Sequence, residues 1–308
     1  MISSFYAHGK LLLTSEYVVL DGALALALPT QRGQKLEILE SDLAPGTLTW
    51  KSFDHENQIW FEMLWDIPAR TVLRSSDEKL ALNLSKIFDA LETLHPGFPS
   101  PEVSWEVHTR LEFPVKWGLG TSSTLIANLA EWAQVNAFVL LKNSLGGSGY
   151  DIACAHADGP IFFQIENEHP IVRSVPFMPI FKDQLIFVYQ EKKQDSKEGI
   201  YRYQERKNKG ILPNIKAFTE LTNTIATSMD LNVFEEAIQQ HETMISELIG
   251  IQPLKETFFK DYPGVIKSLG AWGGDFLLAT CPDGLDVGFN YFHKKGFTTI
   301  FEYGQIIL

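Results

Sequence analysis

The chain of 308 residues carries 38 acidic and 26 basic side chains, for a net charge of −12. This charge repels nucleic-acid phosphates and anionic membranes, so neither is expected as a partner. Cys154 and Cys281 are the only cysteines, and they stand in no ligand spacing, which argues against a disulfide framework or a zinc site. No apolar run reaches the roughly 18 residues that span a bilayer, and residues 1–10 lack a signal-peptide pattern. We therefore expect a soluble, cytoplasmic protein.

The first part of the chain shows strand and helix patterns in alternation. The apolar run 11–28 is typical of two adjacent strands, separated by a turn at Asp21-Gly22. Leucine and isoleucine at helical spacing predict a helix over 77–95, which Pro96-Gly97 ends. Further predicted elements are a helix from 121–123 to about 142, a short helix over 152–157 and a strand over 161–165.

The pattern restarts after Pro179, which favours a boundary near residue 178 and two domains, 1–178 and 179–308. In the second of these, strands and helices follow one another in an order typical of an α+β domain. Its predicted elements are a strand over 183–189, a loop over 190–198, helices over 213–228 and 231–249, a short helix over 263–269 and a strand over 276–280.

Residues 114–124, PVKWGLGTSST, form a glycine–serine turn at the start of a predicted apolar helix. The N-terminus of a helix exposes unpaired N–H groups and about half a positive charge, so it attracts phosphate. Glycines let the backbone approach an anion closely, and hydroxyl groups add donors or an oxygen ligand for Mg²⁺. The turn lacks the Gly-Lys-Ser/Thr of a Walker A loop. From these residues alone, a plain turn with a Ser/Thr cap is an equal alternative.

Three other segments are rich in glycine or charge. The opening segment, residues 7–22, has the sequence AHGKLLLTSEYVVLDG, and the third segment, residues 267–275, has the sequence KSLGAWGGD. The acidic turn, residues 146–151, reads GGSGYD and ends in a carboxylate before a short helix. Taken alone, an aspartate in that position is more typical of a helix cap than of a catalytic base.

Together these segments resemble the motifs of the GHMP kinases. The glycine–serine turn is similar to the PxxxGLGSSA phosphate loop, the opening segment to the APGKxxxxGEYxVxxG motif of mevalonate and phosphomevalonate kinases, and the third segment to their KxSGAGGGD loop. The resemblance implies an α+β, two-domain GHMP kinase fold, with an N-terminal α/β domain that contains the phosphate loop and a C-terminal ferredoxin-like domain. It also implies ATP-dependent phosphorylation of a small-molecule acceptor, with ATP and Mg²⁺, by a monomer or homodimer.

The resemblance further implies which residues act. Asp151 matches the aspartate of the SGxD motif, which orients and deprotonates the acceptor hydroxyl, and Lys10 matches a lysine close to that aspartate and to the transferred phosphoryl group. Ser122 is implied as the protein ligand of Mg²⁺. Glu16 receives no chemical role, because a salt bridge or a turn contact explains it equally well. The implied ATP-binding residues are Lys116, Gly118, Leu119, Gly120, Thr121, Ser122 and Ser123, and the implied acceptor-binding residues are Ser148, Gly149, Tyr150, Gly270, Ala271, Trp272, Gly273 and Gly274.

The sequence departs from the family pattern at His8 and Ser15, where relatives usually have proline and glycine and a loop tolerates the change, and at two further points that bear on function. Trp272 occupies a glycine position of the third segment, and we expect its indole to line the acceptor cleft. Mevalonate kinases carry a Mg²⁺-binding glutamate upstream of SGxD, but no acidic residue lies between Glu131 and Asp151. This absence favours phosphomevalonate over mevalonate as the acceptor. A phosphorylated acceptor calls for a second basic cluster, for which the candidates are Arg110, Lys116, Lys193, Lys197 and Arg202.

Other functions on the same fold remain open. A homoserine kinase fits less well because that family lacks a pair equivalent to Lys10 and Asp151, and sugar kinases of the galactokinase type open with a different motif. A diphosphomevalonate decarboxylase would carry a tryptophan-glycine-lysine segment after the first strand, which is missing. A nucleotide-binding sensor without catalysis is the alternative from another functional class.

Overall fold

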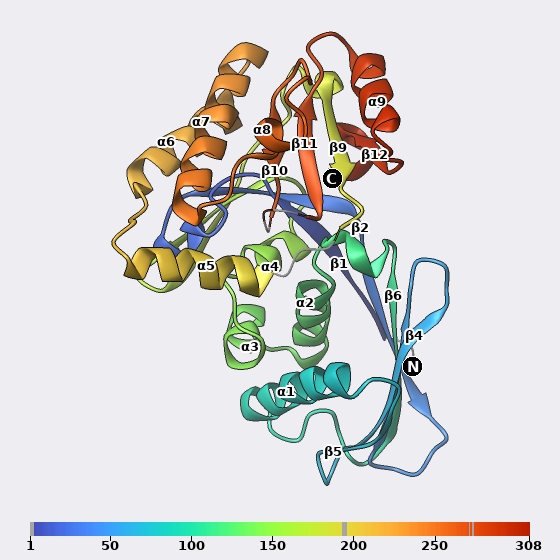
Figure 1. Cartoon of the computed structure of the whole chain (residues 1–308). Coiled ribbons are helices and arrows are strands. Elements are labelled where there is room, and N and C mark those ends of the chain that lie inside the picture. Colours follow the sequence, from blue (N-terminus) through green and yellow to red (C-terminus); the bar gives the residue numbers. More distant parts are fainter. Residues whose placement is uncertain (1–2, 193–195, 271, 273) are drawn as a thin grey trace. The chain divides into compact units, whose positions relative to one another are not determined.

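A computed structural model describes residues 3–192, 196–270, 272 and 274–308. The chain forms two compact units: residues 1–9, 32–115 and 119–156 make the first unit, and residues 10–31, 116–118 and 157–308 make the second. Strands β1 (Ser3–Leu12) and β2 (Ala25–Ser41) contribute residues to both (Figure 1). The units are interleaved along the chain, whereas the predicted domains are consecutive, so the boundary near residue 178 stays a prediction.

The first unit is built on a sheet whose strands follow the order β5-β4-β3-β6-β2. Strand β3 pairs with β6 in parallel, and the neighbouring pairs β2/β6, β3/β4 and β4/β5 are antiparallel. Buried and partly exposed residues alternate along β3, as in a sheet with one face covered. None of β3 to β6 is among the elements predicted above; they are β3 (Thr47–Phe53), β4 (Ile59–Asp66), β5 (Thr71–Ser75) and β6 (Ser104–Leu111).

Helices α1, α2 and α3 lie on one side of this sheet (Figure 1). Helix α1 (Glu78–Leu94) confirms the predicted helix over 77–95, and Asp77 caps it by accepting from Leu80 N. The single helix predicted up to residue 142 is wrong, because the chain turns at Gln134, whose φ is 55°. Asn136 then caps a new helix through the N–H groups of Phe138 and Val139. The resulting elements are α2 (Thr121–Ala133), α3 (Ala137–Ser144) and α4 (Tyr150–Ala155).

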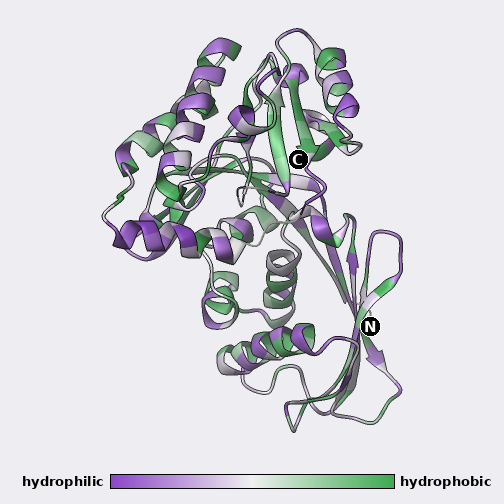
Figure 2. Cartoon of the chain, in the orientation of Figure 1, coloured by the Kyte–Doolittle hydropathy of each residue, from purple (hydrophilic) through white to green (hydrophobic). Residues whose placement is uncertain are grey.

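The second unit contains a four-stranded antiparallel sheet in the order β10-β11-β9-β12. Along the chain, β9 is followed by helices, then by β10 and β11, then by α9 and β12. This βαββαβ order with the first and third strands adjacent is the ferredoxin-like arrangement that the sequence resemblance implies. Figure 2 shows β9 and β11 as predominantly hydrophobic, in keeping with their complete burial. The elements are β9 (Leu185–Tyr189), β10 (Ile266–Ser268), β11 (Phe276–Thr280), α9 (Leu285–Lys294) and β12 (Ile300–Glu302).

Two amphipathic helices of the second unit confirm the predictions from sequence. They are α6 (Ile215–Thr227) and α7 (Leu231–Ile249), and the side chains of Asn214 and Asp230 cap them. Strand β7 (Ile161–Glu166) also agrees with its prediction, and it pairs with the first residues of β2 and with β8 (His169–Ser174). The short helices α8 (Leu254–Thr257) and α10 (Tyr303–Ile306) complete the unit.

Three predicted elements of the second unit are wrong. Residues 263–269 do not form a helix, because β10 pairs with β11 there. The loop predicted over 190–198 overlaps the start of α5 (Ser196–Asn208), and residues 193–195 lie outside the described part of the chain. The apolar run 11–28 is not two strands around Asp21-Gly22, because β1 ends at Leu12 and residues 18–21 form a 3₁₀ turn.

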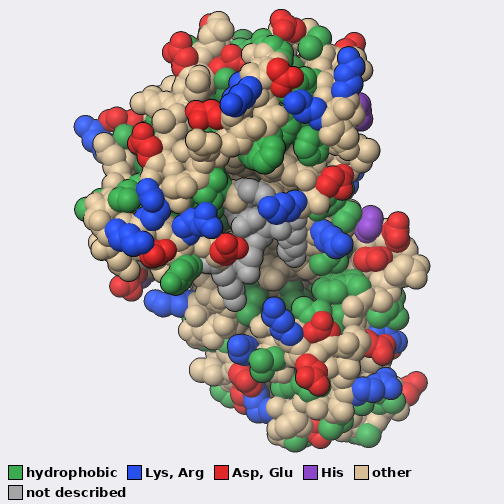
Figure 3. Space-filling view, in the orientation of Figure 1, with side chains coloured by type: hydrophobic (Ala, Val, Ile, Leu, Met, Phe, Trp, Pro, Cys, Tyr) green, Lys and Arg blue, Asp and Glu red, His purple; other side chains and the backbone are tan. Residues whose placement is uncertain are grey.

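Charge is distributed rather than concentrated on one face of the molecule. On the face shown in Figure 3, Lys and Arg side chains are interspersed with Asp and Glu side chains. Among the described helices, none is both long enough and apolar enough to cross a bilayer.

Candidate active site

The glycine–serine turn leads directly into α2 of the first unit. Gly120 occupies the N-cap with a φ of 97°, a conformation that favours glycine, and it brings no side chain to cap the first helical turn. Ser123 is buried and donates its hydroxyl to Gly120 O over 2.9 Å. Ser122 is exposed. The start of α2 therefore combines helix N–H groups with the hydroxyl of Ser122, the combination that suits a phosphate.

In the second unit, residues 116–118 of the same turn contact two charged side chains. Lys10, on β1, donates from Nζ to Gly118 O over 2.8 Å. On its other side, Gly118 packs against a carboxylate: a Cβ placed on this glycine would lie 2.4 Å from Asp275 Cγ. The backbone of Gly118 thus lies between a lysine and an aspartate. Lys10 is attached to the turn by this bond, while its catalytic role stays a prediction.

We expect Gly118→Ala to lower the free energy of unfolding by about 1–3 kcal/mol more than Gly97→Ala does. Both glycines have positive φ, 69° and 83°, so alanine suffers similar backbone strain at each. Nothing lies within 4 Å of a Cβ at Gly97, whereas the carboxylate of Asp275 obstructs the one at Gly118. Urea denaturation of both variants measures the difference. Equal losses would show that the contact with Asp275 does not constrain the turn.

The acidic turn places Asp151 at the start of α4 in the first unit. Gly149 is the N-cap, with a φ of 91°, and a Cβ there would lie 2.9 Å from the ring of Phe138. The half-buried Asp151 accepts at Oδ1 from Ile152 N over 3.0 Å. Ser148 and Tyr150 are likewise partly exposed. The turn therefore holds a reachable carboxylate on a glycine-capped helix, and the roles of Asp151, Ser148, Gly149 and Tyr150 stay predictions.

The third segment lies in the second unit, and its tryptophan is in the core. Trp272 is 3% exposed and packs with Tyr17, Tyr203 and Phe218. Its backbone N–H donates to the hydroxyl of Tyr17 over 3.2 Å. This placement differs from the open cleft wall expected above, because apolar neighbours on the opening segment, α5 and α6 enclose the indole. Gly270 has a φ of 64° and Gly274 O accepts from Gln190 Nε2, while Ala271 and Gly273 lie outside the described residues.

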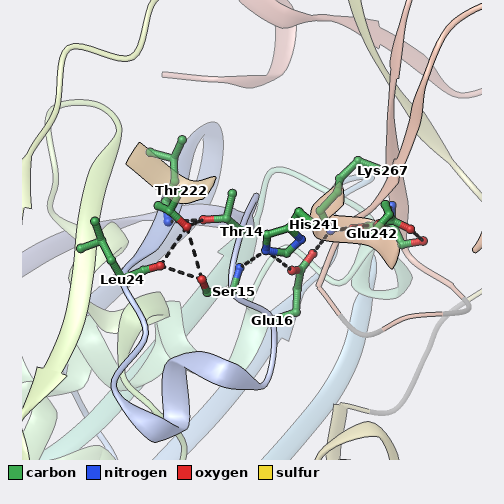
Figure 4. A network of polar contacts seen from close by, with 10 residues as sticks. Thr14, Ser15, Glu16, Leu24, Thr222, His241, Glu242 and Lys267 are labelled. Atoms are coloured by element: carbon green, nitrogen blue, oxygen red, sulfur yellow. Dashed lines mark hydrogen bonds and ion pairs between the residues drawn. The ribbon is translucent and has the colours of Figure 1, made fainter. Parts of the chain in front are cut away.

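A buried ionic cluster connects the opening segment, α7 and the third segment within the second unit (Figure 4). Glu16 forms an ion pair with Lys267, and Lys267 Nζ also lies 3.0 Å from Glu242 Oε1. Next to them, His241 Nε2 accepts from Ser15 N over 2.8 Å. Of the two explanations open for Glu16, the structure therefore supports the salt bridge.

Burial controls protonation in this cluster. It raises the pKa of Glu16 to about 7, although Lys267 acts in the opposite direction, and it raises the pKa of Glu242 as well. Burial, together with the charge of Lys267, lowers the pKa of His241 well below its usual value. The imidazole is therefore neutral, and because its Nε2 accepts from Ser15, the proton lies on Nδ1. For Lys267, burial alone would lower the pKa, but the two carboxylates raise it.

We expect Glu16→Gln to gain stability relative to the wild type as the pH rises from 5 to 8. Folded Glu16 holds its proton up to a pKa of about 7, above its ordinary 4.5. The contribution of Glu16 to stability is therefore complete at a pH below the ordinary pKa of 4.5, and it is lost as the pH rises through the folded-state pKa of about 7. The difference in unfolding free energy between the two proteins should change by up to about 1.4 kcal/mol per pH unit. Urea denaturation across this range measures it, and a constant difference would contradict the shifted pKa.

Among the described residues, no group of three or more His, Cys, Asp or Glu side chains is arranged to hold a metal ion. Mg²⁺ that arrives with a nucleotide needs few protein ligands, because phosphate and water oxygens fill most of its octahedral shell. The exposed hydroxyl of Ser122 fits that limited role.

Two of the five basic residues considered for a phosphorylated acceptor have acidic neighbours. Arg110 Nε donates to Glu37 Oε2 over 3.0 Å, and Arg202 lies 3.4 Å from Glu198. Lys193 and the side chain of Lys197 lie outside the described part of the chain. Lys116 accepts at its backbone oxygen from the hydroxyl of Tyr189. Among the described residues, these contacts single out no basic cluster for an acceptor phosphate, and the basic cluster stays a prediction.

Comparison with known proteins reveals similarity of structure, not of sequence. No protein-family model and no curated protein matches the chain. A phosphomevalonate kinase of Streptococcus pneumoniae, solved with phosphomevalonate and AMPPNP, superposes with a TM-score of 0.69 at 16% identity, covering 98% of this chain and 99% of that one. L. major mevalonate kinase with R-mevalonate gives a TM-score of 0.66 at 16% identity, covering 97% and 94%.

A third structure has a different kind of ligand. The galactokinase of Lactococcus lactis, in complex with galactose, gives a TM-score of 0.66 at 12% identity, covering 97% of this chain and 92% of that one. At such identities the likeness concerns the fold, which all three kinases share over nearly their whole length. The chain has the GHMP kinase fold.

Proposed function

We propose that this protein is an ATP-dependent small-molecule kinase that phosphorylates an intermediate of the mevalonate pathway, phosphomevalonate or mevalonate. The observation that carries this proposal is the glycine-capped start of α2 with Ser122 exposed, within a sequence that resembles the GHMP phosphate loop. The similar fold of a phosphomevalonate kinase solved with AMPPNP supports a nucleotide as its ligand. The acceptor preference rests on the motifs of the opening segment and the acidic turn.

In this mechanism the residues of the chain position the reacting groups and neutralise negative charge. The N–H groups at the start of α2 bind the phosphates, with residues 116–123 forming the loop around them. Ser122, together with phosphate and water oxygens, would hold the Mg²⁺ of the nucleotide, which would supply positive charge beside the phosphoryl oxygens. Asp151 accepts the proton of the acceptor hydroxyl, and Lys10 stabilises the negative charge of the transferring group.

We expect Ser122→Ala to reduce kcat/KM for ATP at least about tenfold, a loss of about 1.4 kcal/mol of transition-state stabilisation. Because Ser122 is exposed, the free energy of unfolding of this variant should differ from that of the wild type by less than about 0.5 kcal/mol. Ser123→Ala is the matched comparison. It removes the bond to Gly120 O and should lower stability by about 1 kcal/mol. Unchanged kinetics in the Ser122 variant would remove this hydroxyl from the site.

The proposed function is tested by acceptor-dependent release of ADP. Purified protein is incubated with ATP and Mg²⁺ and with phosphomevalonate, mevalonate, homoserine or galactose in turn. We expect the highest kcat/KM with phosphomevalonate or mevalonate. A preference for homoserine or galactose would retain the fold and change the acceptor. Tight ATP binding without turnover on any acceptor would identify a nucleotide-binding sensor.

A further inference from the structure

Helix α7 carries two consecutive polar residues that belong to none of the family motifs. His241 and Glu242 are almost fully buried, at 0% and 3% exposure, on a helix whose other buried positions are mostly apolar. Burying a carboxylate and an imidazole has a free-energy cost that hydrogen bonds must offset. The partners of these two side chains therefore indicate what they hold in place.

His241 holds the opening segment. Its Nε2 accepts from the backbone N–H of Ser15 over 2.8 Å. Ser15 has a φ of 62°, an unusual conformation for a residue with a side chain. Its hydroxyl donates to Leu24 O over 2.6 Å. The turn after β1 is thus fixed by His241 from one side and by Leu24, the residue before β2, from the other (Figure 4).

Glu242 holds the third segment. Its Oε1 accepts from the backbone N–H of Ser268 over 2.7 Å and from Lys267 Nζ over 3.0 Å. Lys267 in turn donates to Ser268 O over 2.6 Å. One carboxylate and one ammonium therefore bind both polar groups of the Ser268 main chain, at the point where β10 ends and the glycine-rich residues begin.

Two further contacts join the held segments directly. Glu16, the residue after Ser15, forms an ion pair with Lys267, the residue before Ser268. The hydroxyl of Tyr17 accepts from Trp272 N. Each of the three segments, the opening segment, α7 and the third segment, therefore contacts the other two, and all of these contacts lie within the second unit.

We propose that His241 and Glu242 are positioning residues that couple the opening segment to the third segment through Ser15 and Ser268. The inference rests on the proposed function in one respect: these two segments carry Lys10 and the glycines assigned to the kinase site. A disturbance at either residue of α7 should then reach both segments, although each side chain bonds to only one of them.

Hydrogen exchange measured by mass spectrometry on the full chain tests the coupling. His241→Phe keeps a ring in place but removes the acceptor for Ser15 N. We expect exchange to accelerate at least about tenfold in peptides covering both 12–18 and 265–270. His241→Gln, whose side-chain oxygen can accept that bond, should restore slow exchange in both. Acceleration confined to 12–18 would overturn the proposal.

Two further variants separate coupling from general loss of stability. Phe234→Leu alters the core on the same helix, where Phe234 packs on Phe181 with ring centroids 5.1 Å apart, and should leave both peptides protected. Glu242→Gln is the corresponding change at the second residue of the pair, and it is milder than His241→Phe. It should accelerate exchange in 12–18 about threefold or more, although Glu242 bonds to the third segment. The same acceleration in all variants, Phe234→Leu included, would mean that α7 contributes only stability.

Kinetics provide a second readout. His241→Phe and Glu242→Gln should raise KM for ATP or lower kcat about tenfold at temperatures where circular dichroism shows them folded, and His241→Gln should recover most of the loss. Wild-type kinetics in both impaired variants would contradict a positioning role. If the wild-type protein transfers no phosphate at all, the proposed function fails while the exchange data still decide whether α7 couples the two segments.

Discussion

Replacement of Asp151 by asparagine is expected to reduce turnover at least about a hundredfold, while the affinity for ATP changes little. The amide keeps the size of the side chain and an oxygen that can accept from Ile152 N, so the start of α4 is preserved. It cannot take up the proton of an acceptor hydroxyl. Steady-state rates of ADP release give the turnover, and calorimetric titration with AMPPNP gives the affinity.

Asp158→Asn is the control for this prediction. Asp158 is exposed in the turn that follows α4, and the same chemical change there should leave turnover within about twofold. Full activity of Asp151→Asn on its best acceptor would exclude Asp151 as the base. The proposed mechanism would then be wrong although the fold is that of a kinase.

Lys267→Met is expected to lower the free energy of unfolding by about 3–5 kcal/mol, the largest stability effect predicted for a single residue of this protein. Lys267 is completely buried and is the cation shared by Glu16 and Glu242. Without it, two buried carboxylates lie near one another with no opposite charge, and both must be protonated for the protein to fold. Urea denaturation at pH 7 measures the loss, which should decrease at pH 5.

Removing all three charges should reverse most of this loss. In the triple variant Lys267→Met, Glu16→Gln, Glu242→Gln, no buried charge is left unpaired, and replacement of a whole buried ionic group is often close to neutral. Lys216→Met, on the surface where the side chain is 85% exposed, is the matched control and should change stability little. A triple variant as unstable as Lys267→Met alone would show that packing, not charge, governs the cluster.

Sequence alone could predict the elements in which local and tertiary preferences agree. Helix α1 has an apolar stripe, an Asp77 cap and a Pro96-Gly97 end, and α7 has a stripe with Asp230 as its cap; both occur as predicted. The ferredoxin-like arrangement came from the family resemblance, since β12 has only three residues and α9, although amphipathic, is not among the elements predicted above. The glycine turns at Gly120 and Gly149 also adopt the positive φ that only glycine accepts easily.

The wrong predictions of secondary structure arise where burial on all sides removes the periodic pattern of apolar and polar residues. The three residues of β10, Ile266, Lys267 and Ser268, are all buried, so no alternation distinguishes a strand from a helix there, and pairing with β11 decides between them. In the stretch 121–142, apolar positions continue across the break at Gln134, and the cap at Asn136 is the one local signal that a second helix begins there.

The ionic cluster could not be predicted, because its members are far apart in sequence. Glu16, Glu242 and Lys267 meet only when the opening segment, α7 and β10 pack together. One signal was present: His241 falls on the apolar stripe of α7, between Ile238 and Ile245, where a polar residue needs a buried partner. The contact of Asp275 with Gly118 had no such signal.

The fate of the γ-phosphorus of ATP distinguishes a kinase from a nucleotide-binding protein of the same fold. Phosphorus-31 NMR is recorded on the wild-type protein with ATP, Mg²⁺ and phosphomevalonate or mevalonate. We expect the γ signal of ATP to disappear as ADP and a phosphorylated acceptor appear in equal amounts. The proposed kinase activity is contradicted if ATP remains intact with every acceptor, or if the γ-phosphorus appears only as inorganic phosphate.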